Sequence, residues 1–320
     1  MRITNKMMMD NAVQSMSENL DKMSKLQTKI SSTKDFQYAS EDPARASASL
    51  SLRSNLRSLE SYSATASNTQ DWMTATDMAF EKLDQIAVQA QNLILGGLND
   101  TMTDSERANS IGSQLQTLVN QALELGNSTD NGQYIFSGVN INQKAFVLTD
   151  STGIPTVPPT ANPTLVKFQG DTTTPTTGLI QRSLGPDQTV TLNVRGDQAI
   201  QAFLQSLLDA NNAVKQNQIH DPGTLPGTPT LQTSLAGLQS SLITMDQFRA
   251  SNGARMRQVE SASNFLDTVK IETSSLLSQK EDTNMAEAIA MLENQKTSYQ
   301  AVLEVSKRAI SALTLFDYLQ

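Results

Sequence analysis

The sequence of 320 residues contains no cysteine. Disulfide bonds, thiolate metal ligands and cysteine nucleophiles are therefore excluded. Histidine occurs once, as His220 in the loop sequence QIHDPG, and a single histidine without cysteine cannot build a zinc site. We interpret His220 as a solvated loop residue, because this setting offers no positioned nucleophile or orienting group for a catalytic base.

Sequence motifs for nucleotide and metal binding are also missing. Neither G-x-x-x-x-G-K-[ST] nor G-x-G-x-x-G occurs, and there is no D-x-D-x-D-G calcium loop. No group of residues meets the requirements for catalysis. We expect no enzymatic activity, no cofactor and no metal ion.

Aromatic residues make up only 5% of the chain, so its core must be built from Ala, Leu, Ile, Val and Met. This composition favours closely packed helices. No apolar run approaches the length of a membrane span, and the stretch MRITNKMMMDNAVQS lacks the apolar segment of a cleavable signal peptide. The net charge of −8 repels phosphate backbones and anionic lipids. We expect no nucleic-acid or membrane partner, and any export must use another route.

The most regular pattern present is helical. Near the N-terminus, apolar residues recur at alternating spacings of four and three, interrupted only by Gln27, which is typical of a coiled-coil seam. The residues of this stripe are Met9, Val13, Met16, Leu20, Met23 and Ile30.

The stretch YASEDPARASASL begins a second, much longer helix. Asp42 fits its N-cap position and Pro43 its first helical position, and the helical pattern then continues to about Leu95. We prefer this capping role for the acidic pair Glu41 and Asp42 over an acid–base or metal role. The pair would then mark a hinge between two helices.

Three arginines follow this cap. We expect Arg45, Arg53 and Arg57 to form a solvated polar face with Glu60. The spacing of Arg53 and Arg57 also permits contact with an acidic neighbour in an assembly.

A third helix is predicted after the glycine pair in GGLNDTMTDSE. Thr103 and Glu106 form the S/T-x-x-E pattern of a capping box. The apolar residues that would line the buried face of this helix are Ile111, Leu115, Leu118, Ala122 and Leu125.

The middle of the chain has a different character. Short aromatic and β-branched segments, namely QYIFSG, KAFVL, TLVKFQG, GLIQRSL and TVTLNVRG, read as strands of a small, mainly antiparallel unit. Proline- and threonine-rich loops separate them. A helix from about Gln198 to Gln216 closes this unit.

From about Leu231 the helical pattern returns in two pieces. The second piece carries an apolar stripe made of Met285, Ile289, Leu292, Tyr299, Leu303, Ile310 and Leu313. A weakly amphipathic helix at a chain end often needs a partner. We therefore predict an intermolecular role for residues 1–30 and 285–320.

These patterns predict a mainly α fold with an inserted β-rich domain. Both chain ends would form one long antiparallel helical bundle, with the small β domain inserted like a head on a rod. We expect an N-terminal assembly helix in 1–35, a helical rod in 36–138 and 231–283, the β-rich insert in 139–230 and a C-terminal assembly helix in 284–320.

Several segments together resemble the flagellin family, and within it the hook-associated junction proteins of the bacterial flagellum. They are MRITNKMM, SEDPARA, MTDSERANSIGSQLQTLVNQALELGNSTDNGQYIFSG and EDTNMAEAIAMLENQKTSYQAVLEVSKRAISALTLFDYL. FQGD, NVRGDQAIQAF and SNGARMRQVE fit the same group. The resemblance covers nearly the whole chain in order.

The resemblance implies a structural protein at the hook–filament junction, exported by the flagellar type III apparatus without a cleaved signal. It implies self-assembly into a ring of about eleven copies, between a neighbouring hook-associated protein and the flagellin filament. Contacts between copies would involve Met16, Leu20, Met23, Ile30, Met285, Ile289, Leu292, Tyr299, Leu303, Ile310 and Leu313. An export chaperone would cover the C-terminal helix before assembly.

Two other functions remain open from the sequence. The chain could be a flagellin-type filament subunit, in which case the purified protein would form long filaments. It could instead be a secreted helical effector or adhesin with a binding head.

Overall fold

The computed structural model describes residues 2–99, 102–150, 163–170, 179–219 and 229–318. Within these ranges, the side chains of residues 2–6, 8–9 and 309–318 are not described. His220 lies outside the described residues. The chain divides into two compact units, which we call the terminal unit (residues 1–59 and 268–320) and the central unit (residues 60–267).

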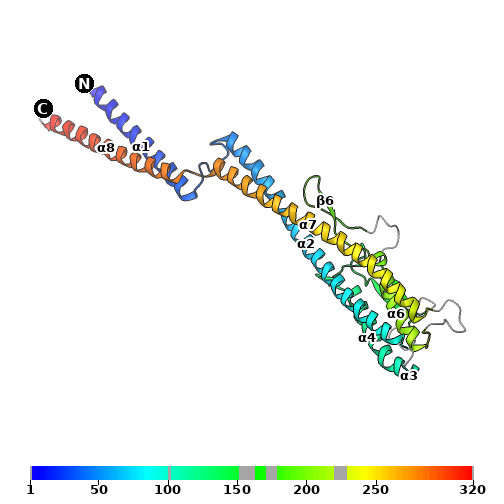
Figure 1. Cartoon of the computed structure of the whole chain (residues 1–320). Helices are drawn as coiled ribbons and strands as arrows, with labels where there is room; N and C mark the ends of the chain where they lie inside the picture. Colours follow the sequence, from blue (N-terminus) through cyan, green and yellow to red (C-terminus); the bar gives the residue numbers. More distant parts are fainter. Residues whose placement is uncertain (1, 100–101, 151–162, 171–178, 220–228, 319–320) are drawn as a thin grey trace. The chain divides into compact units, whose positions relative to one another are not determined.

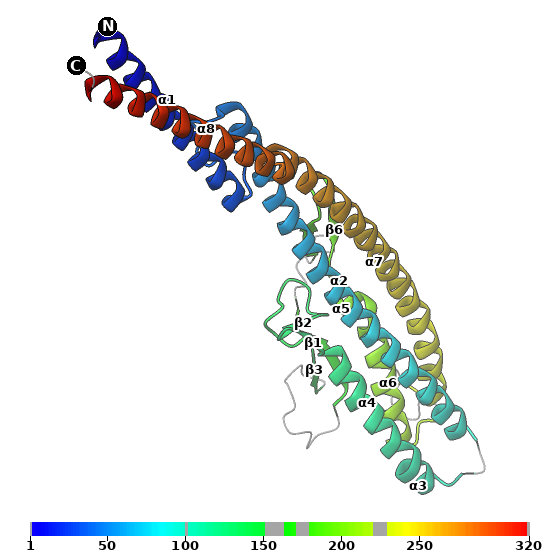
Figure 2. The same ribbon diagram turned by 90° about the vertical axis from the view of Figure 1, so that its left-hand side faces the viewer.

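Four long helices supply most of the chain. They are α1 (Arg2–Ser32), α2 (Pro43–Gly97), α7 (Leu231–Glu281) and α8 (Met285–Tyr318). In the terminal unit α1 and α8 lie side by side and antiparallel, so that the two chain ends are neighbours (Figures 1 and 2). The predicted helix from residue 44 to about residue 95 and the two-piece helical C-terminal region are both confirmed.

The central unit packs short helices against α2 and α7. It contains α3 (Asp104–Glu106), the π-helix η1 (Arg107–Ile111), α4 (Gly112–Gly126), α5 (Gly196–Ala199) and α6 (Gln201–Lys215). The predicted capping box is present, because the Thr103 hydroxyl accepts from Glu106 N and the Glu106 carboxylate accepts from Thr103 N. Behind it Arg107 is buried and donates to the carbonyl oxygens of Gly97, Asn99 and Met102.

The core of the central unit lies between α2, α4 and α6. The predicted α4 face is buried at Leu115, Leu118 and Ala122. Phe80 of α2 meets Phe136 edge to face, with ring centroids 5.5 Å apart. Such aromatic packing stabilises the core beyond the area it buries.

Among the described residues, six short strands form three separate antiparallel pairs. β1 (Thr129–Asp130) pairs with β2 (Gln133–Tyr134), β3 (Phe146–Thr149) with β4 (Leu165–Phe168), and β5 (Gln181–Ser183) with β6 (Thr189–Thr191). A mainly helical chain with long helices at both ends and small antiparallel sheets is therefore confirmed.

The segment QYIFSG forms less strand than its composition predicts. Only Gln133 and Tyr134 belong to β2. Ile135 still donates to Ser128 O, but Phe136 O accepts from Gly196 N, so the chain leaves the hairpin there. Burial of the Ile135 and Phe136 side chains in the helical core then decides their conformation.

Candidate assembly interface

The antiparallel pair of α1 and α8 carries the residues singled out from the sequence. On each helix the partly or fully buried residues recur at alternating spacings of four and three, which is the heptad pattern of a coiled coil. We call this line of contact the terminal seam. Its residues are Ala12, Met16, Asn19, Met23, Leu26 and Ile30 on α1, and Ala288, Leu292, Gln295, Tyr299, Val302 and Ser306 on α8.

A polar layer interrupts the terminal seam near its middle. The Gln295 side-chain amide donates to Asn19 Oδ1 over 2.5 Å. This bond joins α1 and α8 directly across the terminal seam. A polar pair inside a coiled coil specifies register at a cost in stability.

The residues predicted to line contacts between copies separate into two groups. Met16, Met23, Ile30, Leu292 and Tyr299 lie on the terminal seam within one chain. The side chains that remain largely exposed are Leu20, Met285, Ile289 and Leu303, with 37–49% of their surface accessible. Ile310 and Leu313 lie on α8, but their side chains are outside the described residues.

The stripe inferred for α1 combined two faces of that helix. Met16, Met23 and Ile30 are seam residues, whereas Val13 and Leu20 are exposed by 58% and 49%. The seam continues instead through Ala12, Asn19 and Leu26. Ala12 and Asn19 directly precede the stripe residues Val13 and Leu20, and Leu26 directly precedes Gln27, which interrupted the stripe. Ala12 is small and Asn19 is polar, so neither gave an apolar signal. Only a strict heptad count would have placed these two residues on the seam.

Four exposed apolar residues lie along one edge of the helix pair. Val13 and Leu20 follow directly after Ala12 and Asn19 on α1, and Ile289 and Leu303 follow directly after Ala288 and Val302 on α8. In an antiparallel coiled coil the positions directly after equivalent seam residues face the same edge on both helices. We call this set (Val13, Leu20, Ile289 and Leu303) the apolar edge.

The segment that follows α1 and the segment that precedes α8 are hydrogen-bonded to each other. A β-bridge links Lys34 and Asp282, Asp35 N donates to Glu281 O and Thr283 N donates to Thr33 O. The segment between α1 and α2 is thereby held against the segment between α7 and α8. We call residues 33–42 and 280–284, with the side chains that bind them, the linker clasp.

Ion pairs reinforce the linker clasp. Arg53 donates to both carboxylate oxygens of Glu281 over 2.7 and 2.6 Å, and Lys34 approaches the same carboxylate at 3.2 Å. Glu281 is only 5% exposed. The hydrogen bond from Arg53, followed by that from Lys34, lowers the pKa of Glu281.

A second group of charges surrounds Asp35. Its carboxylate accepts from Lys29 over 2.8 Å and from Arg45 over 2.5 Å, and these contacts lower the pKa of Asp35. Arg45 also lies 5.4 Å from the centre of the Phe36 ring and donates to Lys280 O. Arg45 and Arg53 remain partly exposed, but both also bind groups from distant parts of the chain, which the expectation of a solvated face did not include.

The acidic pair before α2 lies at the edge of the linker clasp. Asp42 Oδ1 accepts from Arg45 N over 3.0 Å, and Asp42 O accepts from Ala46 N at the first turn of the helix that begins at Pro43. Glu41 accepts from Gln37 N in the preceding turn. Both acidic side chains thus bind backbone amides.

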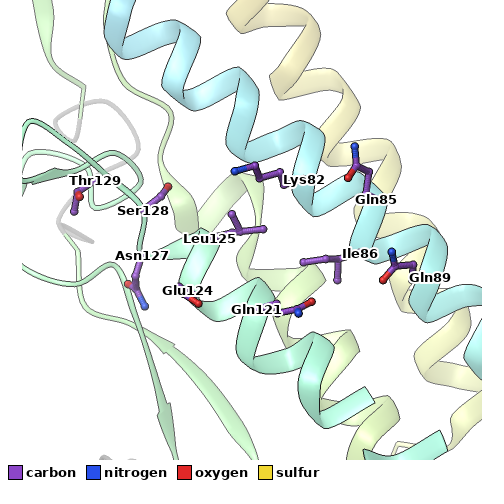
Figure 3. A pocket seen from close by; sticks show the side chains of 10 residues that line it. All are labelled: Lys82, Gln85, Ile86, Gln89, Gln121, Glu124, Leu125, Asn127, Ser128 and Thr129. Atoms are coloured by element: carbon purple, nitrogen blue, oxygen red, sulfur yellow. The ribbon is translucent and has the colours of Figure 1, made fainter. Parts of the chain in front are cut away.

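The central unit contains a groove of about 600 Å³ between α2 and α4 (Figure 3). Ile86 and Leu125 approach one another from the two helices, and amides and hydroxyls surround them. The lining residues are Lys82, Gln85, Ile86, Gln89, Gln121, Glu124, Leu125, Asn127, Ser128 and Thr129. Such a lining can hydrogen-bond a polar chain but offers no paired acids and no nucleophile with a base.

Within the described ranges, no cluster of three metal-ligating side chains occurs. Among the same residues, no helix combines the length and apolarity needed to cross a bilayer.

Comparison with known proteins finds one family model that matches the N-terminal part of the chain. Residues 3–141 match the family model described as the bacterial flagellin N-terminal helical region. This stretch is similar to the N-terminal helical region of flagellins, and we call it the flagellin-type region. It contains α1, α2, α4 and the first hairpin, and for this flagellin-type region the resemblance seen in the sequence is confirmed.

A curated protein matches over the same length. Flagellar hook-associated protein 3 of Salmonella typhimurium is 28% identical over 139 residues, which is 43% of this chain. The match spans 44% of that protein, so less than half of the relative is covered.

Solved structures share the fold over a longer stretch. A putative flagellar hook-associated protein from Vibrio parahaemolyticus aligns with a TM-score of 0.61 at 14% identity, covering 76% of this chain and all of that one. FlgL from Bacillus cereus gives 0.55 at 16% identity, covering 71% and 99%. The flagellar junction protein FlgL from Legionella pneumophila gives 0.52 at 11%, covering 73% and 99%. The fold extends beyond the flagellin-type region into the C-terminal half.

Proposed function

We propose that this protein is a structural junction protein of the bacterial flagellum, located between hook and filament, without enzymatic activity. The observation that carries the proposal is the apolar edge on the pair of terminal helices. The first helix of this pair, α1, belongs to the flagellin-type region. Proteins named for the flagellar hook and junction have this fold and match part of this sequence.

The terminal seam by itself buries little. Met16, Met23, Leu292 and Tyr299 are only partly buried, although they lie on the seam. Helices of this kind gain most of their stability from packing an apolar face against other elements. A neighbouring copy that covered the apolar edge would complete the burial that α1 and α8 cannot achieve alone.

Helix α8 offers apolar side chains on both sides of its seam. Ile289 and Leu303 belong to the apolar edge, while Met291 and Val305, on the opposite side of the seam, are exposed by 49% and 67%. One side could bind a neighbouring copy and the other a different partner. This arrangement supports an export chaperone bound to α8 before assembly, because exposed apolar helices need cover.

The finer proposal follows the predicted domains and partners. Residues 1–35 and 284–320 serve as assembly helices, 36–138 and 231–283 as the rod, and 139–230 as the insert. Copies form a ring of about eleven, with a hook-associated protein on the hook side and flagellin on the filament side. The chain is secreted and located in the flagellum.

The apolar edge gives a direct test. We expect the double substitution Val13→Ser and Leu20→Ser to leave the central unit folded and the protein exported, while attachment of filaments to hooks fails. Electron microscopy with immunogold labelling of isolated hook–filament structures measures both attachment and the position of the protein. Met78→Ser with Leu95→Ser is the matched control, since these exposed residues of α2 belong to the central unit.

A normal filament with an unaltered band of label at its base would contradict the assembly role of the apolar edge. Label along the whole filament, together with long filaments formed by the purified chain, would support a filament subunit instead. The flagellin-type region is the observation that keeps this second function in view.

A further inference from the structure

The sequence contains two Asn–Gly pairs, and the structure places them in opposite surroundings. Asn131–Gly132 lies between β1 and β2, and Asn252–Gly253 lies inside α7. An Asn followed by Gly is prone to attack of the glycine amide on the asparagine side chain, because glycine has no side chain to hinder it. The fold then decides whether the two groups can meet.

Asn131 and Gly132 form the exposed turn of the first hairpin. Their φ angles are +48° and +79°, which is the two-residue turn with positive φ at both positions. A Cβ atom placed on Gly132 would meet nothing within 4 Å, so the turn has free space around it. Within the described part of the chain, Gly132 N–H has no hydrogen-bond acceptor.

The strands that hold this turn are the shortest possible. β1 and β2 contribute two residues each. Among the residues that the structure describes, the Asn131 side chain bonds through its Nδ2 to Asp130 Oδ2 over 3.3 Å and to no other group. A short hairpin gains little from its own pairing. Local opening of the turn is therefore far easier than opening of the helical core.

Asn252 and Gly253 provide the opposite case within the same molecule. Asn252 is fully buried, and its Nδ2 donates to Met73 O of α2 over 2.9 Å. Gly253 lies inside α7, so its amide is held in the helical hydrogen-bond pattern. Attack by this amide requires part of α7 to unfold.

We propose that Asn131 is a site of spontaneous deamidation and backbone isomerisation in the folded protein, and that Asn252 is protected. The Gly132 nitrogen bonds to Asn131 Cγ, the Cγ–Nδ2 bond breaks, and ammonia leaves with the amide proton. Water then opens the resulting cyclic imide at either carbonyl. The product is aspartate or isoaspartate, in which the backbone passes through the former side-chain carbonyl.

Isoaspartate changes the hairpin more than aspartate does. It adds one carbon atom to the backbone inside a two-residue turn, so the pairs Asp130–Gln133 and Thr129–Tyr134 lose their register. Both products also place a second negative charge next to Asp130. We expect the bond from Ile135 N to Ser128 O, which continues the hairpin, to weaken.

The experiment incubates the full-length protein at mildly alkaline pH, either native or in concentrated urea, and follows both Asn–Gly peptides by mass spectrometry. The gain in mass on replacing NH₂ by OH marks deamidation, and isoaspartyl methyltransferase labels the isomerised product. In the native protein we expect the product at residue 131 to form more than about a hundredfold faster than at residue 252, since α7 must open for the latter. In urea the two rates should agree within about tenfold, since no fold separates the sites.

The proposal is overturned if residue 131 stays unchanged in the native protein while both sites react in urea, because the hairpin would then be protective. Equal rates at both sites in the native state, or no reaction at either site in urea, would overturn it as well. Asn131→Gln is the control that should abolish the product, since its ring would be larger and closes slowly. Asn131→Asp, measured without ageing, carries the added charge without the added backbone atom. Aged wild-type protein should therefore show faster hydrogen exchange at Ile135 than this fresh variant does.

Discussion

The terminal seam and the core of the central unit are both built from helices, but they bury their residues to very different degrees. In the central unit, Phe136, Phe203 and Leu207 have no accessible surface. In the terminal seam, Met16, Met23 and Leu292 are only partly buried. A two-helix seam has one buried line, whereas a core enclosed from several sides shields whole side chains. We therefore expect the central unit to be stable alone, and the terminal helix pair to gain stability when neighbouring copies cover it.

The largest expected effect comes from a substitution in the core of the central unit, on which the stability of that unit depends. Phe203→Ala should lower the free energy of unfolding by about 3–5 kcal/mol, because it removes a fully buried ring from a closed core. Met16→Ala on the seam should lower it by less than about 2 kcal/mol, since that side chain is already partly solvated. Chemical denaturation followed by circular dichroism measures both, and equal losses would contradict the contrast between the two regions.

A smaller effect concerns acid and the linker clasp. The pKa values of Glu281, Asp35 and Asp282 are lowered in the folded state by their cationic partners. Groups with lowered pKa stabilise the fold above their unfolded pKa and lose this contribution as pH falls through the folded value. We expect the clasp amides of Asp35 and Thr283 to lose hydrogen-exchange protection as the pH falls below about 4.

The matched variant for this acid effect is Glu281→Gln, with exposed Glu272→Gln on the same helix as its control. Loss of the Arg53 pair should cost about 1–2 kcal/mol of local protection at neutral pH, because Arg53 is half exposed and partly screened. The variant should also show a weaker dependence on acid. If the clasp amides lost hydrogen-exchange protection in acid to the same extent in Glu281→Gln, groups other than Glu281 would control this loss.

The smallest effect tests the start of α2. Asp42→Ala removes the acceptor for Arg45 N and should cost about 1 kcal/mol of stability in the terminal unit. Asp42→Asn keeps an acceptor oxygen and should restore most of this loss. Thermal melts of the full chain compare the variants, and an Asn variant as unstable as the Ala variant would argue against capping.

Local signals in the sequence predicted the elements well. The capping box at Thr103 and Glu106, the helix starting at Pro43 and the return of helix near Leu231 each depend on residues close together in the chain. Such rules act within one or two turns, so a single sequence is enough to read them.

Contacts between distant segments were not predictable in the same way. Arg53 and Glu281 are 228 residues apart, and nothing near either one indicates the other. The terminal seam passes through Ala12 and Asn19, which lack an apolar signal, while Val13 and Leu20 beside them suggested the wrong line. The turn at Ile135 and Phe136 likewise follows from burial against helices that a strand pattern does not show.

The bond between Asn19 and Gln295 has a consequence for the order of events in time. It joins residues 276 positions apart, so α1 is synthesised long before its partner helix exists. Closing so long a loop is slow compared with forming the local helices of the central unit. We therefore expect the terminal seam to form after the local helices of the central unit. A chain that is still emerging from a ribosome or a narrow channel would keep α1 unpaired until α8 has emerged.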